Sequence, residues 1–178
     1  MKKLLLHSCC APCSTTAIMR LIDEYDITIF YYNPNIEPLS EYEHRKSEQI
    51  RLIKELDRNI KFIDGDYDND AYQEYITDYK ELGEHSMRCY KCMEMRIDKT
   101  GKYASSNDFD CFTTTLSVSP YKNSTWINEI LEKVSIKYNI PYVESNFKKK
   151  NGYLESVEMS KKYNLYRQNY CGCLKNKQ

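Results

Sequence analysis

The sequence is poor in the residues that interrupt regular structure, with five glycines and five prolines among 178 residues. It also lacks internal repeats, low-complexity tracts and Gly/Ser linkers, which predicts a single domain spanning residues 1–178. No charge of one sign dominates, because 26 Lys and Arg face 26 Asp and Glu. Residues 141–178 are the exception, with eight basic and three acidic side chains. Such a cationic tail suits either an anionic partner or a solvated surface.

Long hydrophobic runs are missing too. A membrane-spanning helix needs about 20 apolar residues and a signal peptide about 7–15, whereas Met1-Lys2-Lys3 precedes only three leucines. We therefore expect a cytoplasmic protein with no membrane contact. In that reducing compartment clustered cysteines serve metal or redox chemistry, so we expect the protein to be disulfide-free.

Cysteine is abundant, with eight residues, and seven of them fall into three short motifs. The eighth, Cys111, stands alone in DCFTTTL and is predicted to be a small buried strand residue. The candidate metal ligands are Cys9, Cys10 and Cys13 in CCAPC, Cys89 and Cys92 in CYKC, and Cys171 and Cys173 in CGC.

Four thiolates complete a tetrahedral zinc site, so CYKC with any other pair would suffice for structural zinc. Seven thiolates exceed one such site, and the spacings of CCAPC and CGC are poor for zinc. The adjacent side chains of Cys9 and Cys10 diverge unless the backbone bends, which suits two neighbouring metals better than one. The count favours four thiolates on an iron–sulfur cluster and three on a second metal with an open coordination position.

Apolar periodicity alternates between short strands and amphipathic helices. This alternation predicts an α/β fold with a mostly parallel sheet and flanking helices, whose ligand lies at the carboxyl ends of the strands. CCAPC follows the first strand and opens the first helix, where nucleotide-binding proteins carry a Gly-rich phosphate loop that is absent here. We expect strands at 3–7, 27–32, 60–63, 110–118 and 141–144, helices at 14–24, 40–56, 71–82, 89–103 and 126–138, and an irregular or weakly helical remainder.

Five motifs in fixed order resemble the QueH-type epoxyqueuosine reductase family over about residues 4–174. They are LLLHSCCAPCS, YYNPNIEP with the following EYEHR, RCYKC, FTTTLSVSPYKN and LYRQNYCGC. The resemblance implies a cobalamin-independent oxidoreductase that removes the epoxide oxygen of epoxyqueuosine in tRNA, giving queuosine at the wobble position. It further implies a 4Fe–4S cluster with an adjacent mononuclear iron and an external electron donor. The implied fold is similar to that of tRNA-sulfur-transfer ATPases, a HUP or PP-loop type α/β fold, without the ATP motif.

By position, all the clustered cysteines except Cys13 match metal-binding cysteines of the family. Aspartate holds the place of Cys13 in some members and is thought to help bind the lone iron. With cysteine there, the resemblance implies an all-sulfur mononuclear site in this chain.

The implied reaction needs a proton donor, because the epoxide oxygen leaves as water. His7, two residues before Cys9, is the candidate for this catalytic role, and a structural histidine at a strand end is an equal alternative. Modified bases in RNA loops are read by aromatic stacking and edge hydrogen bonds, with cations on the backbone. The predicted substrate-binding residues are Tyr32, Asn33, Asn35, Tyr121, Lys122, Lys149, Tyr166, Arg167 and Gln168.

Two other functions account for parts of the sequence. A zinc-stabilised RNA-binding module without catalysis explains CYKC and the basic tail but gives CCAPC no purpose. A cysteine-based sulfur-transfer enzyme would use Cys9, Cys10 or Cys13 as a low-pKa nucleophile at a helix start. A colourless protein would favour the first alternative, and activity that survives iron chelation would favour the second.

Overall fold

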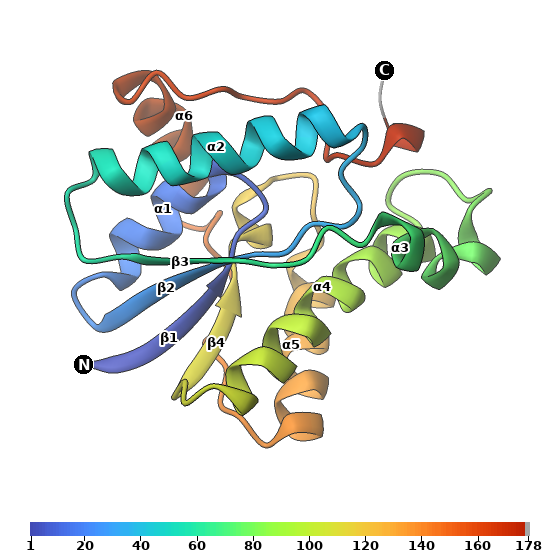
Figure 1. Cartoon of the computed structure of the whole chain (residues 1–178), viewed down its shortest axis with the longest axis horizontal. Helices are drawn as coiled ribbons and strands as arrows, with labels where there is room; N and C mark the ends of the chain where they lie inside the picture. Colours follow the sequence, from blue (N-terminus) through green and yellow to red (C-terminus); the bar gives the residue numbers. More distant parts are fainter. Residues whose placement is uncertain (177–178) are drawn as a thin grey trace.

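The computed structural model describes residues 1–176, which form one parallel sheet with helices on both faces (Figure 1). The expected α/β fold is confirmed. Each strand is parallel to its neighbours, in the order β3-β2-β1-β4. The strands are β1 (Lys2–His7), β2 (Tyr25–Tyr31), β3 (Lys61–Asp64) and β4 (Cys111–Thr114).

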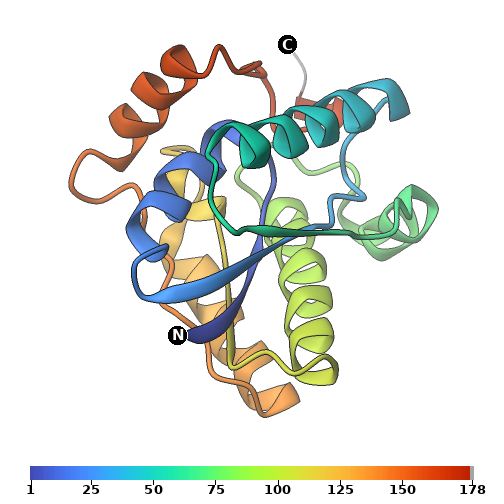
Figure 2. The ribbon, with the colours of Figure 1, turned by 60° about the vertical axis from the view of Figure 1, so that its left-hand side comes forward.

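Helices cover the sheet in two layers that both views of the ribbon show (Figures 1 and 2). One layer contains α1 (Ala11–Leu21), α2 (Leu39–Glu55) and α6 (Gly152–Lys162), with α1 packed against the other two. The other contains α4 (Met87–Ser106) and α5 (Ser124–Tyr138), and α3 (Asn69–Tyr75) lies against α4. Residues 1–176 also contain three short 3₁₀ helices: η1 (Thr77–Tyr79), η2 (Leu116–Val118) and η3 (Leu174–Asn176).

The central strand β1 feeds both layers because its side chains alternate between the faces of the sheet. Leu5 packs into the cluster formed with α4 and α5, whereas Leu4 and Leu6 pack into the cluster formed with α1. All three leucines are fully buried, as expected for a strand covered on both sides.

Three predicted elements differ from the structure. The strand expected at 110–118 ends at Thr114, whose hydroxyl accepts from the Leu116 N–H and turns the chain into η2. The helix expected at 71–82 stops early, because Ile76 leaves the helical backbone region before η1. The strand expected at 141–144 is reduced to one bridge between Tyr142 and Phe112. The remainder, expected to be irregular or weakly helical, contains the regular helix α6.

The strand order reverses at β1, which lies between β2 and β4. In open parallel sheets the crevice at such a point, beyond the carboxyl ends of the strands, is the usual ligand site. Cys9 follows β1 and Thr115 follows β4, and the Cys9 N–H donates to Thr115 Oγ1 at 3.4 Å. The topology therefore places CCAPC at this crevice. No helix within residues 1–176 is both long enough and apolar enough to cross a membrane.

Candidate metal centre

The CCAPC motif gathers three sulfurs at the start of α1. The chain bends at Cys9, and Cys10 precedes the helix in an extended conformation. Pro12 fits the first helical turn, where its missing N–H costs nothing. The sulfurs of Cys9, Cys10 and Cys13 all lie within 4.8 Å of one another, and those of Cys9 and Cys10 are 3.8 Å apart. The bend thus prevents the divergence expected of adjacent cysteines, and the triad could hold a metal ion.

The three thiols of this triad differ in acidity. Hydrogen bonds from Cys10 and Cys13 lower the pKa of Cys9 well below its usual range, and the Thr115 hydroxyl adds to the effect. A hydrogen bond from Cys13 lowers the pKa of Cys10. The interactions with Cys9 and burial outweigh this effect and raise the pKa of Cys10 to about 12. Because metals bind thiolates, metal binding to this triad would release its remaining thiol protons.

A second group of sulfurs comes from α4 and the C-terminal segment. Arg88 Nη1 donates to the Cys173 sulfur at 3.4 Å, and the Tyr72 hydroxyl hydrogen-bonds to both Cys92 and Cys173. Burial raises the pKa of Cys92 and of Cys173. This group is looser than the triad, because no other three metal-ligating groups in residues 1–176 lie within 4.8 Å of one another.

Both sulfur groups border one cavity of about 1170 Å³. Cys9 and Cys13 line it from the N-terminal motif, Cys89 from α4 and Cys171 from the C-terminal motif. Segments far apart in the sequence therefore meet at one site.

Cys111 is buried at the start of β4 and is paired in register with Leu4, as expected for a structural residue. All eight cysteines are free, so the expected lack of disulfides is confirmed.

Three buried arginines hold the cysteine segments, and sequence reasoning assigned them no role. Arg45 of α2 donates to the carbonyl oxygens of Tyr170 and Cys171. On α4, Arg88 contacts Cys173, and Arg96 Nε donates to the Cys92 carbonyl at 3.1 Å. Positions 88, 92 and 96 recur every four residues, so one helix face carries arginine, cysteine and arginine. This spacing of four residues was the pattern in the sequence that could have identified Arg88 and Arg96 as residues of the site.

His7 is fully buried, and both of its ring nitrogens have hydrogen-bond partners in the protein. Its Nδ1 lies 2.8 Å from Thr114 Oγ1, and its Nε2 lies 2.9 Å from the Tyr32 carbonyl. The carbonyl can only accept, so Nε2 carries the proton and Nδ1 accepts from the threonine. Burial lowers the pKa of His7 to about 4, which keeps the ring neutral. This geometry favours the structural interpretation of His7 over the catalytic one.

Three predicted substrate-binding residues, Tyr32, Asn33 and Asn35, lie in the protein interior. Tyr32 packs in the core under Lys99, whose Nζ lies 5.6 Å from the ring centroid. Asn33 is fully buried and donates from Nδ2 to the Ser8 carbonyl at 2.8 Å, next to Cys9. Asn35 is buried beside Gly172 of the CGC motif. None of the three lines the large cavity. The Glu37 N–H donates to the Gly172 carbonyl, so the CGC segment lies over the turn that carries Asn33 and Asn35.

Four predicted substrate-binding residues do line the cavity: Tyr121, Lys122, Arg167 and Gln168. Tyr121 is 70% exposed at its mouth. Tyr166 does not line it, because its hydroxyl donates to the Glu41 carboxylate at 3.1 Å and its ring contacts His44.

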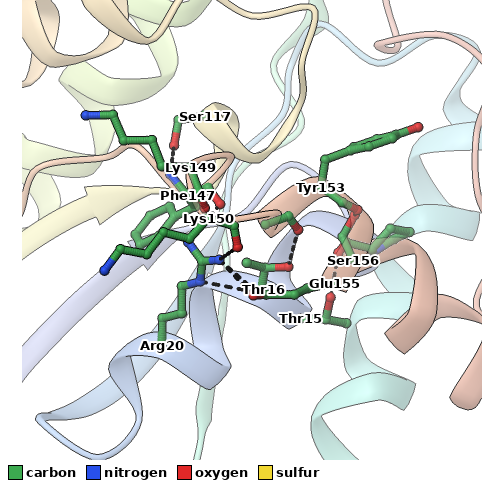
Figure 3. A network of polar contacts seen from close by, with 12 residues as sticks. Thr15, Thr16, Arg20, Ser117, Phe147, Lys149, Lys150, Tyr153, Glu155 and Ser156 are labelled. Atoms are coloured by element: carbon green, nitrogen blue, oxygen red, sulfur yellow. Dashed lines mark hydrogen bonds and ion pairs between the residues drawn. The ribbon is translucent and has the colours of Figure 1, made fainter.

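Lys149 lies outside the cavity, in a turn that Arg20 clamps (Figure 3). Arg20 donates to the carbonyl oxygens of Phe147, Lys149 and Lys150 and pairs with Glu155 at the start of α6. The Lys149 side chain is exposed, whereas its neighbour Lys148 lines the cavity and donates to the Lys122 carbonyl. Of the lysine run, the structure therefore places Lys148 at the cavity and Lys149 outside it, and the predicted phosphate contact of Lys149 stays a prediction.

The fold and the site define a class: α/β proteins with a parallel sheet in which clustered cysteines occupy the carboxyl edge of the sheet. Within that class, the family model of epoxyqueuosine reductase QueH matches residues 4–178, and the chain belongs to this family.

Curated relatives match along nearly the whole chain. The epoxyqueuosine reductase QueH of Thermotoga maritima is 38% identical over 98% of this chain and 90% of its own length. That of Acinetobacter baylyi is 41% identical over 97% and 79%, and that of Staphylococcus aureus 40% identical over 97% and 74%. A predicted subunit of a tRNA methyltransferase from Methanocaldococcus jannaschii is similar in fold, with a TM-score of 0.54 at 15% identity over 89% of this chain and 74% of that one.

Proposed function

We propose that this chain is an epoxyqueuosine reductase that converts epoxyqueuosine in tRNA to queuosine. The reaction breaks both epoxide C–O bonds, forms a C=C bond, takes up two electrons and two protons, and releases water. Membership of the family and the cavity shared by both sulfur groups support this assignment. The electrons come from an external donor, and the tRNA substrate places the protein in the cytoplasm.

We further propose that the seven clustered cysteines hold a 4Fe–4S cluster and an adjacent mononuclear iron. The donor set fits, because thiolates are the ligands that iron–sulfur clusters take. The tight triad suits a single ion, whereas the looser second group suits a larger inorganic unit. When bound, these groups would supply single electrons and a Lewis-acidic position for the epoxide oxygen.

The cavity lining fits a polyanionic substrate. Among residues 1–176, its charged side chains comprise five cations and a single carboxylate, that of Glu84. The five are Arg45, Arg96, Lys122, Lys148 and Arg167. A volume of about 1170 Å³ exceeds the roughly 300–1,000 Å³ of small-molecule pockets, which leaves room for a nucleoside and its flanking phosphates.

Aromatic and amide side chains at the cavity suit recognition of a splayed-out base. Tyr121, Trp126 and Tyr153 offer stacking surfaces. Gln168 Oε1 is buried and has no hydrogen-bond partner within residues 1–176, so a donor on the substrate would satisfy it. We therefore propose that Tyr121, Lys122, Arg167 and Gln168 contact the substrate directly, while Tyr32, Asn33 and Asn35 support the loop that carries Cys9.

The decisive experiment is anaerobic reconstitution with iron and sulfide, followed by one turnover on tRNA bearing epoxyqueuosine with dithionite as reductant. Mass spectrometry of the digested nucleosides should show queuosine in an amount that follows the loaded enzyme. Retention of the epoxide by fully loaded protein would refute the reductase assignment.

A sulfur-transfer enzyme is the second candidate, and the lowered pKa of Cys9 favours it. Chelation of iron before the turnover separates the two functions. A reductase loses activity with its iron, whereas a thiol nucleophile retains it. A colourless protein that binds only zinc would instead favour the RNA-binding module.

A further inference from the structure

Arg96 is a buried cation at the cavity wall. Arg96 is only 2% exposed, yet it lines the cavity together with Cys9, Cys89 and Cys171. One guanidinium nitrogen, Nε, donates to the Cys92 carbonyl of its own helix at 3.1 Å. Burial of a full positive charge costs several kcal/mol unless an opposite charge compensates it. A compensating anion must therefore lie close to Arg96.

In the described part of the chain, no carboxylate takes that role. Within residues 1–176, Arg96 forms no ion pair with an aspartate or glutamate, unlike Arg45, whose Nε pairs with Glu41 at 2.7 Å. The interactions that raise the pKa of Arg96 come first from the sulfurs of Cys92, Cys9 and Cys171, which are thiolates when they bind a metal. Although burial alone would lower the pKa of Arg96, these sulfurs raise it.

These three sulfurs come from all three cysteine motifs. Cys9 belongs to the triad at the start of α1, Cys92 lies one turn before Arg96 on α4, and Cys171 opens CGC. Arg96 thus interacts with sulfurs of both groups. Arg88 contacts Cys173, and Arg45 interacts with Cys10 and holds the backbone of the C-terminal segment.

We propose that Arg96 is a positioning residue that serves as the shared counter-charge of the metal site and sets its reduction potential. This inference rests on the proposed function. One-electron reduction adds one negative charge to a thiolate-ligated centre and consumes no proton at Arg96, which stays ionised at every working pH. A fixed cation in a low-dielectric site stabilises the more negative, reduced state, so its removal makes reduction harder.

The test compares reconstituted wild-type protein with Arg96→Met and Arg96→Lys. Iron and sulfide contents are measured first, and then the midpoint potential in an anaerobic dithionite titration followed by EPR. For Arg96→Met we expect the equilibrium constant for one-electron reduction to fall at least tenfold, which is 59 mV for a one-electron couple. Arg96→Lys should recover at least half of that shift. Lys102→Met, which removes an exposed charge from the same helix, should leave the potential unchanged.

Each result decides the proposal. A fully loaded Arg96→Met protein with the wild-type potential overturns it. If Arg96→Met binds no iron, Arg96→Lys decides: a loaded lysine variant near the wild-type potential supports a charge role, and an unloaded one shows that the shape of arginine matters instead. Failure of the wild-type protein itself to bind iron would refute the proposed cofactors, which is a different outcome.

Discussion

The Nη1 atom of Arg45 in α2 donates to the carbonyl oxygen of Cys171, 126 residues further along the chain, at 3.2 Å. Nη2 donates to the Tyr170 carbonyl at 3.1 Å, and Nε pairs with Glu41. One buried side chain thus fixes the approach of the C-terminal segment to the cavity.

Arg45→Met should destabilise the protein by about 3 kcal/mol. The substitution leaves the Glu41 carboxylate without its ion-pair partner and the carbonyl oxygens of Tyr170 and Cys171 without a hydrogen-bond donor. Urea denaturation under anaerobic conditions measures the loss. Lys54→Met, an exposed cation on the same helix, is the control and should change stability by less than about 0.5 kcal/mol. Equal effects of the two variants would show that Arg45 does not hold the segment.

Cys89→Ser should abolish incorporation of the iron–sulfur cluster, because it removes a thiolate at the cavity wall. Cys111→Ser should leave incorporation intact, since that thiol is buried at the start of β4, away from the cavity. Iron content and visible absorption after reconstitution measure both. A bleached Cys111→Ser protein that remains folded would contradict this assignment.

Gly172→Ala should disturb the CGC loop. Gly172 has a φ of +118°, and a Cβ there would lie 2.7 Å from Ile36 Cγ1. We expect a loss of about 1–3 kcal/mol in the free energy of unfolding and reduced iron content. The matched control is Gly83→Ala, where an added Cβ meets nothing within 4 Å. Wild-type iron content in Gly172→Ala would argue against a role for this loop geometry in metal binding.

Lys122→Gln and Arg167→Gln should weaken tRNA binding. If each cation neutralises one phosphate beside the cavity, each variant lowers the slope of log affinity against log salt by about 0.7. Affinities measured by filter binding at several salt concentrations give this slope. Lys2→Gln, at the far end of β1 from Cys9, should leave it unchanged. A slope that stays constant in all three variants would exclude these phosphate contacts.

Arg20→Met should loosen the turn that joins Phe147 to α6, because the arginine satisfies three carbonyls there (Figure 3). We expect a loss of about 1–2 kcal/mol. Hydrogen exchange should accelerate at residues 147–155, whereas the strands should keep their protection. Lys161→Met, an exposed cation on α6, should leave exchange in this segment unaltered.

Local pattern predicted the order of the elements and the sulfur-lined edge. The β-branched and aromatic run from Ile27 marks β2, and apolar residues at helical spacing mark α1. CCAPC had to follow β1 and open a helix, which fixed its place at the carboxyl edge of the sheet. The resemblance to a known family supplied the reaction and the expected cofactors, whereas the cysteine count alone only favoured an iron–sulfur cluster with a second metal over zinc.

Long-range contacts explain why the positions of the other predicted site residues could not be predicted from the sequence. Asn33 and Asn35 have the sequence of an exposed turn, but the Glu37 N–H donates to the Gly172 carbonyl, so the CGC segment covers them. His7 is buried because Thr114 and the Tyr32 carbonyl satisfy both ring nitrogens. These partners lie 25 to 107 residues away, and no local pattern encodes such pairings.

Helix α1 connects two features that are separate in the chain. Its first turn carries Cys13, and its last turn carries Arg20, which clamps the lysine turn before α6. Eleven helical residues span about 16 Å, so a rigid rod fixes the spacing between the sulfur triad and this clamped turn. An RNA that contacted both features would have to span this fixed distance. If it bound one nucleotide out of register, the wrong base would lie at the sulfurs.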